Sequence, residues 1–410
     1  MIGTAAPGAT SADEVVTLAR RLIAIDATNP SLVPGGAGER ELAIFVAAWL
    51  DERGFQVQLM GADPARPSVL ARRGGRGDGA ALLLAGHLDT VGGPGTGAGS
   101  AADGAAAVGE GGADEDRLVG RGAYDMAGGL AAAMVAAAFA PPGLAGDVVL
   151  AFAADEEFGS VGMEELLAAI DAEPQTARAA RPDAAIVLEP TDLEVTLAHR
   201  GFAWFRVEYE GLAAHGSQPE LGIDAIDRAL EGMIALRGLA VELAARPRHP
   251  LLGAGGVRVA TVEGGTDAAT VADRCTLIVE RRTLPGEEDP GAELARVLAA
   301  SRPARIVPLV ARAAMEADPD ARIARAVLAA VERATGSPAV RRGDPWWTDA
   351  GLIADAGIPV VLVGPVGGGA HADEEWVSAA SLRTLVEVVG SVIVDVCGRA
   401  AGPGAHPAVG

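Results

Sequence analysis

The chain contains no lysine, only two cysteines and few aromatic side chains among its 410 residues. Without lysine it cannot use a Walker A phosphate loop, a Schiff-base lysine or a Ser-Lys dyad, because each depends on that side chain. Two cysteines are too few for a disulfide framework. Since Cys275 and Cys397 both lie in apolar contexts, we expect buried, reduced thiols. With aromatic residues at 3%, the core must consist mainly of Ala, Val and Leu.

Positive charge is scarce as well. The 33 basic residues are all arginine and face 55 acidic residues, which gives a net charge of −22. Such a protein has no attractive surface for nucleic acids or anionic membranes. No cationic segment followed by an apolar one opens the chain, and the longest apolar helical run, 130–140, is too short to span a bilayer. We therefore expect a cytoplasmic protein that binds neither nucleic acid nor membrane.

Apolar strand-like runs alternate with helical patterns over much of the chain, whose length is typical of two or three domains. The expected strands are 81–85, 147–153, 184–188 and 359–363. The expected helices are 10–25, 39–53, 127–139, 163–170 and 322–335. Continuous apolar strands separated by helices are typical of an α/β sheet covered on both faces.

The middle of the chain follows another pattern. Segments 195–211 and 274–284 alternate more regularly, and helical patterns occupy 222–239 and 290–300. This order favours a smaller α+β domain inserted into the α/β one. We place it at 199–313, so that 1–198 and 314–410 form the two parts of the larger domain. The Gly/Ala-rich stretch 92–116 is expected to be a loop.

A histidine and an aspartate follow the first of these strands. His87 ends the apolar run and Asp89 comes two residues later. Side chains at i and i+2 of a strand share a face, so the Asp89 carboxylate can hydrogen-bond the second ring nitrogen of His87. A carboxylate-oriented imidazole is typical of metal ligands.

Four more places in the chain carry acidic or histidine side chains next to an expected strand or helix. Asp125 lies in a Gly-rich turn before a helix, where it could also serve as an N-cap. Glu156 and Glu157 belong to an acidic triplet after a strand, which could also be a solvated loop. Glu189 ends another strand, and His371 lies in a Gly-rich loop after the last one. Ligands of open α/β sheets gather at the carboxyl ends of the strands, so we expect these side chains to converge.

The converging residue types predict a two-metal centre. Carboxylates together with two imidazoles suit Zn²⁺, with Co²⁺ and Mn²⁺ as substitutes. One aspartate can bridge two ions, and a water held by such ions loses a proton near neutral pH. Glu156 would take that proton and return it to the leaving group.

Five motifs resemble those of the M20 metallopeptidase family, which includes acetylornithine deacetylase, succinyl-diaminopimelate desuccinylase, aminoacylase and glutamate carboxypeptidase. They are G-H-L-D-T at 86–90, G-R-G-A-Y-D-M-A-G-G at 120–129, D-E-E-F-G-S at 155–160, E-P-T at 189–191 and A-H-A-D-E at 370–374. The resemblance implies an α/β catalytic domain with a mixed sheet covered by helices and two zinc ions per chain. It also implies that 199–313 is a lid domain that forms a homodimer.

The same resemblance implies a role for each residue. Asp125 would bridge the ions, with His87 and Glu189 on one ion and Glu157 and His371 on the other. Glu156 would be the general base and acid, and Asp89 the partner of His87.

Two further roles concern the lid. His215, in L-A-A-H-G-S-Q-P-E, matches a lid histidine that reaches the tetrahedral intermediate, often across a dimer interface; from the sequence alone it could be a surface-loop histidine. Arg282 matches an arginine that grips a substrate carboxylate, which suits its bidentate geometry, or it is a lid-surface arginine.

The chain departs from the family pattern at three places. Ala127 replaces a common lysine, and the Gly/Ala tract 92–116 replaces an aromatic-Pro segment. The lid asparagine usual near 264–269 is absent, and Asn29 is the only asparagine in the chain. The last two changes affect substrate recognition and leave the metal chemistry intact.

These observations predict a zinc-dependent hydrolase that uses a metal-activated water to cleave the amide bond of an N-acyl amino acid or related small acylated amine. A dipeptidase or carboxypeptidase of the same family is the alternative, with a dipeptide as substrate. A metal-dependent binding protein without catalysis is the more distant one, although every catalytic position is retained.

Overall fold

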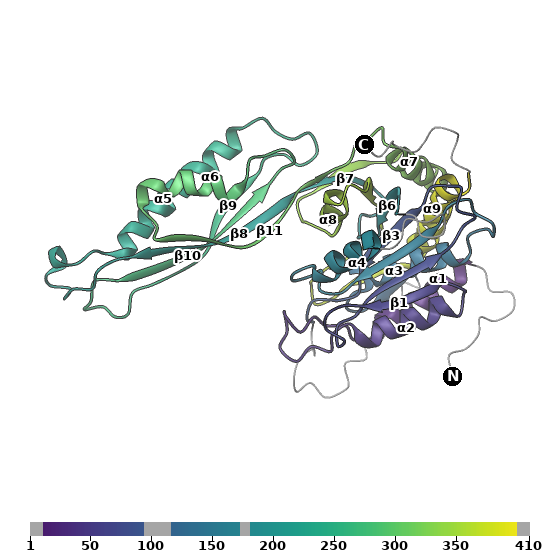
Figure 1. Cartoon of the computed structure of the whole chain (residues 1–410), viewed down its shortest axis with the longest axis horizontal. Coiled ribbons are helices and arrows are strands. Elements are labelled where there is room, and N and C mark those ends of the chain that lie inside the picture. The colour runs from purple at the N-terminus through teal and green to yellow at the C-terminus, as the bar shows by residue number, and fades with distance from the viewer. Residues whose placement is uncertain (1–10, 94–115, 173–180, 400–410) are drawn as a thin grey trace. The chain divides into compact units, whose positions relative to one another are not determined.

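The computed structural model describes residues 11–93, 116–172 and 181–399 (Figure 1). These residues divide into two compact units. The first contains the described residues up to Leu197, Ala317–Arg342 and the described residues from Thr348 onward, and the second contains Ala198–Glu316 and Gly343–Trp347. The second unit was expected at 199–313, and it also includes the short segment Gly343–Trp347. The loop expected at 92–116 lies almost wholly outside the described residues.

A mixed nine-stranded sheet, most of whose strands belong to the first unit, has the strand order β1-β2-β5-β3-β6-β14-β7-β12, with β13 beside β7. Strands β5, β3, β6 and β14 run parallel to their neighbours in this group, whereas β1 and β2 are antiparallel. The strands are β1 (Gln56–Met60), β2 (Ser68–Arg73), β3 (Leu82–His87), β5 (Val148–Ala153), β6 (Ala184–Val187), β7 (Val195–His199), β12 (Met315–Glu316), β13 (Arg341–Asp344) and β14 (Val360–Leu362).

Both faces of this sheet are covered, because every residue of β3, β5 and β6 is buried. Leu82 and Leu84 point into one core, which they share with the helices on that face. Those helices are α1 (Ser11–Ile23), α2 (Arg40–Asp51), α3 (Gly128–Ala138), α7 (Arg322–Thr335) and α9 (Ala379–Cys397). The remaining helices, α4 (Val161–Ala172) and α8 (Ala350–Asp355), pack against β5 and β14 respectively.

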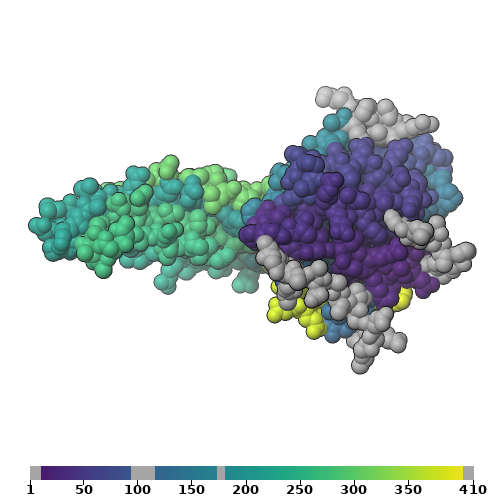
Figure 2. Space-filling view, turned by 90° about the horizontal axis from the view of Figure 1, so that it is seen from below, coloured from purple at the N-terminus to yellow at the C-terminus, as the bar shows by residue number. Residues whose placement is uncertain are grey.

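The small side chains of α3 let this helix lie deep in the fold. All of its residues from Gly128 to Ala137 are buried, as an Ala- and Gly-rich sequence permits. Both cysteines are free and buried, as expected. In Figure 2 the N-terminal segment (purple), which includes α1, α2 and β1, forms much of the visible surface of this unit. No helix in the described part of the chain is both long and apolar enough to cross a bilayer.

The second unit is an antiparallel sheet with helices on one face. Its strand order is β11-β8-β10-β9, from β8 (Gly201–Glu210), β9 (Gly256–Gly264), β10 (Arg274–Thr283) and β11 (Arg305–Arg312). Alternate residues of β8, such as Phe205 and Val207, pack against α5 (Ala225–Ala245) and α6 (Pro290–Leu298). The mixed α/β fold class with a smaller α+β part is therefore confirmed. The sequence pattern did not predict the strands β1, β2, β9, β11, β12 and β13 or the helices α8 and α9, and the single segment expected at 195–211 is two strands, β7 and β8.

Candidate metal centre

The carboxyl ends of three neighbouring parallel strands place the candidate ligands. His87 ends β3, Glu157 follows β5 by four residues, and Glu189 follows β6 by two. Because these strands run parallel and adjacent, their ends meet at one edge of the sheet. Asp125 lies in the turn η1 (Ala123–Ala127) that leads into α3, and its own backbone is not helical. His371 lies in the loop between β15 (Gly367–Gly368) and β16 (Trp376–Ser378).

The five side chains form two groups that share Asp125. His87, Asp125 and Glu189 make one group, and Asp125, Glu157 and His371 make the other; within each, the ligand atoms lie within 4.8 Å of one another. Oδ1 of Asp125 is 2.9 Å from Nε2 of His87, and Oδ2 is 3.5 Å from Nε2 of His371. The two oxygens of Asp125 therefore face different groups, as a bridging carboxylate requires.

The remaining distances complete each group. Nε2 of His87 is 3.8 Å from Oε1 of Glu189, and Nε2 of His371 is 3.1 Å from Oε2 of Glu157. Ligands placed about 2 Å from a tetrahedral ion are about 3.3 Å apart. The donor atoms are thus spaced as a small divalent cation needs, and the donor set of imidazole and carboxylate suits zinc.

Glu375, which no sequence motif singles out, holds the main chain around Asp125. Its buried carboxylate accepts hydrogen bonds from the N–H groups of Gly122, Tyr124 and Asp125, and it pairs with Nη1 of Arg121 at 2.8 Å. Gly122 has a positive φ of 75°, which favours glycine at this turn. No local sequence signal separates Glu375 from the exposed acid before it.

The close packing of charged groups shifts the pKa values of several candidate ligands. Burial alone would raise the pKa of Asp125, but hydrogen bonds with His371 and His87 lower it below its ordinary range. Hydrogen bonds to Asp125 and Glu157 raise the pKa of His371 to about 10. Burial, followed by repulsion from neighbouring carboxylates, raises the pKa of Glu189 well above its ordinary value. A cation between these carboxylates would relieve their repulsion.

Glu156 lies beside the two groups but belongs to neither. Burial raises the pKa of this carboxyl well above its ordinary value, and repulsion from Glu189 and Asp349 adds to the increase. A carboxylate with a raised pKa, held next to a candidate metal site, is suited to accept and return a proton.

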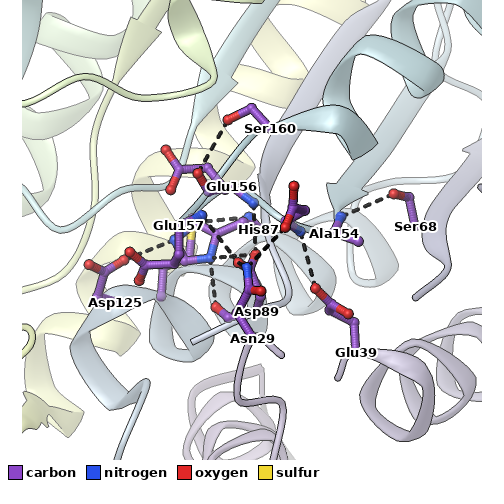
Figure 3. Close-up of polar contacts among 12 residues, drawn as sticks. Asn29, Glu39, Ser68, His87, Asp89, Asp125, Ala154, Glu156, Glu157 and Ser160 are labelled. Carbon is purple, nitrogen blue, oxygen red and sulfur yellow. Dashed lines mark hydrogen bonds and ion pairs between the residues drawn. The ribbon is translucent and has the colours of Figure 1, made fainter. Parts of the chain in front are cut away.

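The contact between His87 and Asp89 differs from the expected one. Nδ1 of His87 donates to the main-chain oxygen of Asp89 at 2.8 Å, and the Asp89 carboxylate is 3.6 Å away. The strand ends at His87, so the period-two geometry assumed for Asp89 does not extend to it. Its carboxylate instead accepts the main-chain N–H groups of Glu156 and Glu157, at 3.0 and 3.1 Å (Figure 3). Asp89 therefore fixes the imidazole through its carbonyl and the acidic turn through its side chain.

The two residues expected from the lid lie in the second unit. His215 is exposed, and its Nδ1 is 2.8 Å from Oγ of Ser217. Arg282 pairs through Nη2 with Glu280 at 2.9 Å and lies over the ring of Phe202. Their roles toward a substrate remain predictions.

A mixed α/β sheet with two His–carboxylate groups joined by one aspartate, and Glu156 beside them, is the arrangement expected of a metallohydrolase with a binuclear centre. Residues 83–395, most of the chain, match the family model described as peptidase family M20/M25/M40. The chain belongs to this family. It is a metal-dependent hydrolase of amide or peptide bonds, and the family prediction is confirmed.

Known relatives agree with this assignment. The chain is 31% identical over 291 residues to N-acetyl-L-citrulline deacetylase of Xanthomonas campestris pv. campestris, covering 68% of this chain and 74% of that one. It is 27% identical over 404 residues to acetylornithine deacetylase of Proteus mirabilis, covering 93% and 96% respectively.

Solved structures share the fold. Aminopeptidase PepT from Bacillus cereus superposes with a TM-score of 0.70 at 19% identity, over 94% of this chain and 98% of that one. A dinuclear metal binding peptidase of the M20 family from Bacillus subtilis gives a TM-score of 0.67 at 15% identity, over 94% and 98%.

Proposed function

We propose that this protein is a two-zinc hydrolase that cleaves the amide bond of an N-acyl amino acid or a related small acylated amine. The observation that carries the proposal is the placement of Asp125, whose two oxygens face two separate His–carboxylate groups. The relatives named as deacetylases of acetylornithine and N-acetylcitrulline support the substrate class.

Five side chains would hold the two ions. Asp125 would bridge them, with His87 and Glu189 on one side and Glu157 and His371 on the other. Zinc fits this donor set, and Co²⁺ or Mn²⁺ would be substitutes. When bound, the ions supply a polarised carbonyl and a water with a lowered pKa.

Glu156 would carry the proton. Its carboxylate would take a proton from the attacking water and deliver it to the nitrogen of the departing amine, which leaves as a neutral group. Asp89 keeps this glutamate in place through the main-chain N–H of Glu156. We propose that residues 199–313 act as the lid, with His215 donating a hydrogen bond to the developing oxyanion and Arg282 gripping the substrate carboxylate.

Hydrolysis of a substrate panel tests the proposal. Metal-free protein reloaded with Zn²⁺, Co²⁺ or Mn²⁺ would be given N-acetyl, N-succinyl and longer N-acyl amino acids beside dipeptides. We expect metal-dependent release of amine from the N-acyl compounds, loss of turnover in Glu156→Gln, and full turnover in Glu41→Gln, which changes an exposed acid on α2. Preference for dipeptides would favour the peptidase alternative. Two bound metals without turnover of any compound would favour the binding protein.

We also propose a homodimer through the second unit. Four exposed apolar side chains lie on one face of α5, namely Ile226, Leu230, Ile234 and Val241. Their spacing of four, four and seven residues aligns them along the helix. Beside α5, strand β9 is an edge of the sheet and exposes Val262. An apolar stripe beside an open strand edge is suited to pairing with a second copy.

Sedimentation tests this assembly. Ile234→Asp, at the centre of the stripe, should convert a dimer to a monomer, while Glu231→Gln on the same helix should leave it unchanged. A monomeric wild type with full activity would contradict both the dimer and a role for His215 across subunits.

A further inference from the structure

A buried polar cluster adjoins the metal centre on the side of the N-terminal loop between α1 and α2. Asn29 is its central member: the residue is fully buried, and its side-chain nitrogen donates to Oδ2 of Asp89 at 2.8 Å and to Oδ1 of Asp155 at 3.1 Å. Figure 3 shows Asn29 on the opposite side of Asp89 from Glu156. One amide thus joins two carboxylates that belong to different strand ends.

Each of the two carboxylates controls part of the acidic turn. Asp89 accepts the main-chain N–H groups of Glu156 and Glu157, so its orientation sets two successive peptide planes. Those planes fix the directions in which the two glutamate side chains leave the chain. Asp155 begins the turn and has a φ of +67°, which is unusual for a residue other than glycine.

The left-handed conformation of Asp155 is held by contacts from outside the turn. Its N–H donates to Oε1 of the buried Glu39 at 3.2 Å, and its Oδ1 lies 2.9 Å from Nη1 of Arg66. Arg66 in turn pairs with Glu39 through two nitrogens. Glu39 and Arg66 therefore tie the start of the turn to α2 and to the 61–67 loop. Asn29 also donates to the Asp155 carboxylate.

Asn29 is itself fixed by main-chain contacts to the strand-end segment. Its N–H donates to the main-chain oxygen of Thr90 at 2.9 Å, and the N–H of Thr90 donates to Ala27 at 3.1 Å. The side-chain oxygen of Asn29 accepts the N–H of Ser31 at 2.8 Å, which leaves the nitrogen directed at the two carboxylates. A neutral amide suits this position, because a third carboxylate would repel both neighbours and donate to neither.

We propose that Asn29 is a positioning residue for the general base: its amide locks the Asp89 carboxylate and the Asp155 turn together and so sets the orientation of Glu156. The residue cannot touch substrate, because it is fully buried. Its effect on catalysis rests on the amide hydrolysis proposed above, whereas its effect on the turn does not. Small errors in the placement of a reacting group cost large factors in rate, so kcat is the parameter that Asn29 should control.

Asn29→Asp is the informative variant, because it keeps the shape of the side chain and the acceptor for Ser31 but removes both donors. Thr28→Val is the matched control. Thr28 is the buried neighbour of Asn29, and its hydroxyl donates to Asp26 at 2.6 Å without contacting Asp89 or Asp155. A general loosening of the loop would affect both variants, whereas the proposed role affects only Asn29→Asp.

Two readouts separate this proposal from the proposed function. With the best substrate of the panel, Asn29→Asp should lower kcat roughly 100-fold and change KM less than about threefold, while Thr28→Val should change neither by more than about threefold. Hydrogen exchange of the metal-free protein, read on the peptide that contains Glu156 and Glu157, should be at least about tenfold faster in Asn29→Asp and unchanged in Thr28→Val.

If the wild type hydrolyses nothing in the panel, the proposed function fails and hydrogen exchange still tests the role of Asn29. Unchanged exchange in Asn29→Asp would overturn the positioning role. Equal losses of kcat in Asn29→Asp and Thr28→Val would overturn it as well, because they would point to general destabilisation of the loop.

Discussion

The carboxylate of Glu375 accepts the main-chain N–H of Asp125 at 2.9 Å, across 250 residues of sequence. The same carboxylate accepts two more N–H groups of that turn, so Asp125, the proposed bridging residue, is held by the loop that also carries His371. Two separate parts of the chain thus assemble one ligand set.

Replacing Glu375 should therefore weaken metal binding. Three main-chain N–H groups now donate to the two carboxylate oxygens of Glu375. Glu375→Gln leaves one oxygen to accept these hydrogen bonds, and its new NH₂ group faces N–H donors. We expect a 10- to 100-fold loss of metal affinity, as is typical when a partner of a metal ligand is removed. Competition with a chelator measures this. Glu374→Gln is the control, because Glu374 is exposed and pairs with Arg117. Equal affinities in the two variants would refute the role of Glu375.

Metal removal should lower the stability of the first unit. The centre brings Asp125, Glu157 and Glu189 together, and a bound cation compensates their repulsion. A ligand that binds only the folded state adds about 2.7 kcal/mol at a concentration of 100 times its Kd. Thermal unfolding with and without chelator should show a lower Tm for the metal-free protein. In Asp125→Asn added zinc should raise Tm much less; an equal rise would show that the metal binds elsewhere.

His199 should make the protein sensitive to acid. Burial lowers the pKa of this histidine to about 4, compared with about 6.5 in the unfolded chain. The unfolded state therefore binds a proton that the folded state does not, and stability falls as pH falls from about 6.5 to 4. His199→Phe removes this contribution. Between pH 7 and 4.5, the free energy of unfolding should fall by about 2 kcal/mol more in the wild type than in the variant. Parallel pH profiles in urea unfolding would contradict the prediction.

Gly129 should not tolerate a side chain. A Cβ at this position in α3 would lie 2.1 Å from the main-chain oxygen of Leu188, the residue before Glu189. We expect Gly129→Ala to destabilise the fold by about 1–3 kcal/mol, the usual cost of overpacking, and to weaken metal binding.

Gly390→Ala is the matched control for that substitution. It lies in helix α9, and its Cβ would meet nothing within 4 Å. Because alanine is the better helix former, this variant should be unchanged or more stable by up to about 1 kcal/mol. Urea unfolding of both variants checks the pair, and equal stabilities would contradict the steric argument.

The sequence contained enough information to place the strand ends that carry the site. Runs such as 82–87 and 148–153 are apolar throughout because both faces of the sheet are covered, and that pattern is local. The exposed edge strand β9 lacks such a pattern, which is why it was not anticipated. Helix α9 is strongly apolar, but the sequence did not predict it. A buried helix and a buried strand are similar in composition, so an apolar run alone does not distinguish them.

By itself, then, the sequence determined which residue types follow which strands, and so the set of candidate metal ligands. The tertiary structure alone decided which neighbours hold those residues. Asp89 supports His87 through its carbonyl, and Asn29 lies 60 and 126 residues from the two carboxylates that it contacts. Glu375 is buried and accepts three main-chain N–H groups, whereas its neighbour Glu374 is exposed. Strand and helix signals are local, whereas these contacts form only when distant segments pack together, and no spacing along the chain encodes them.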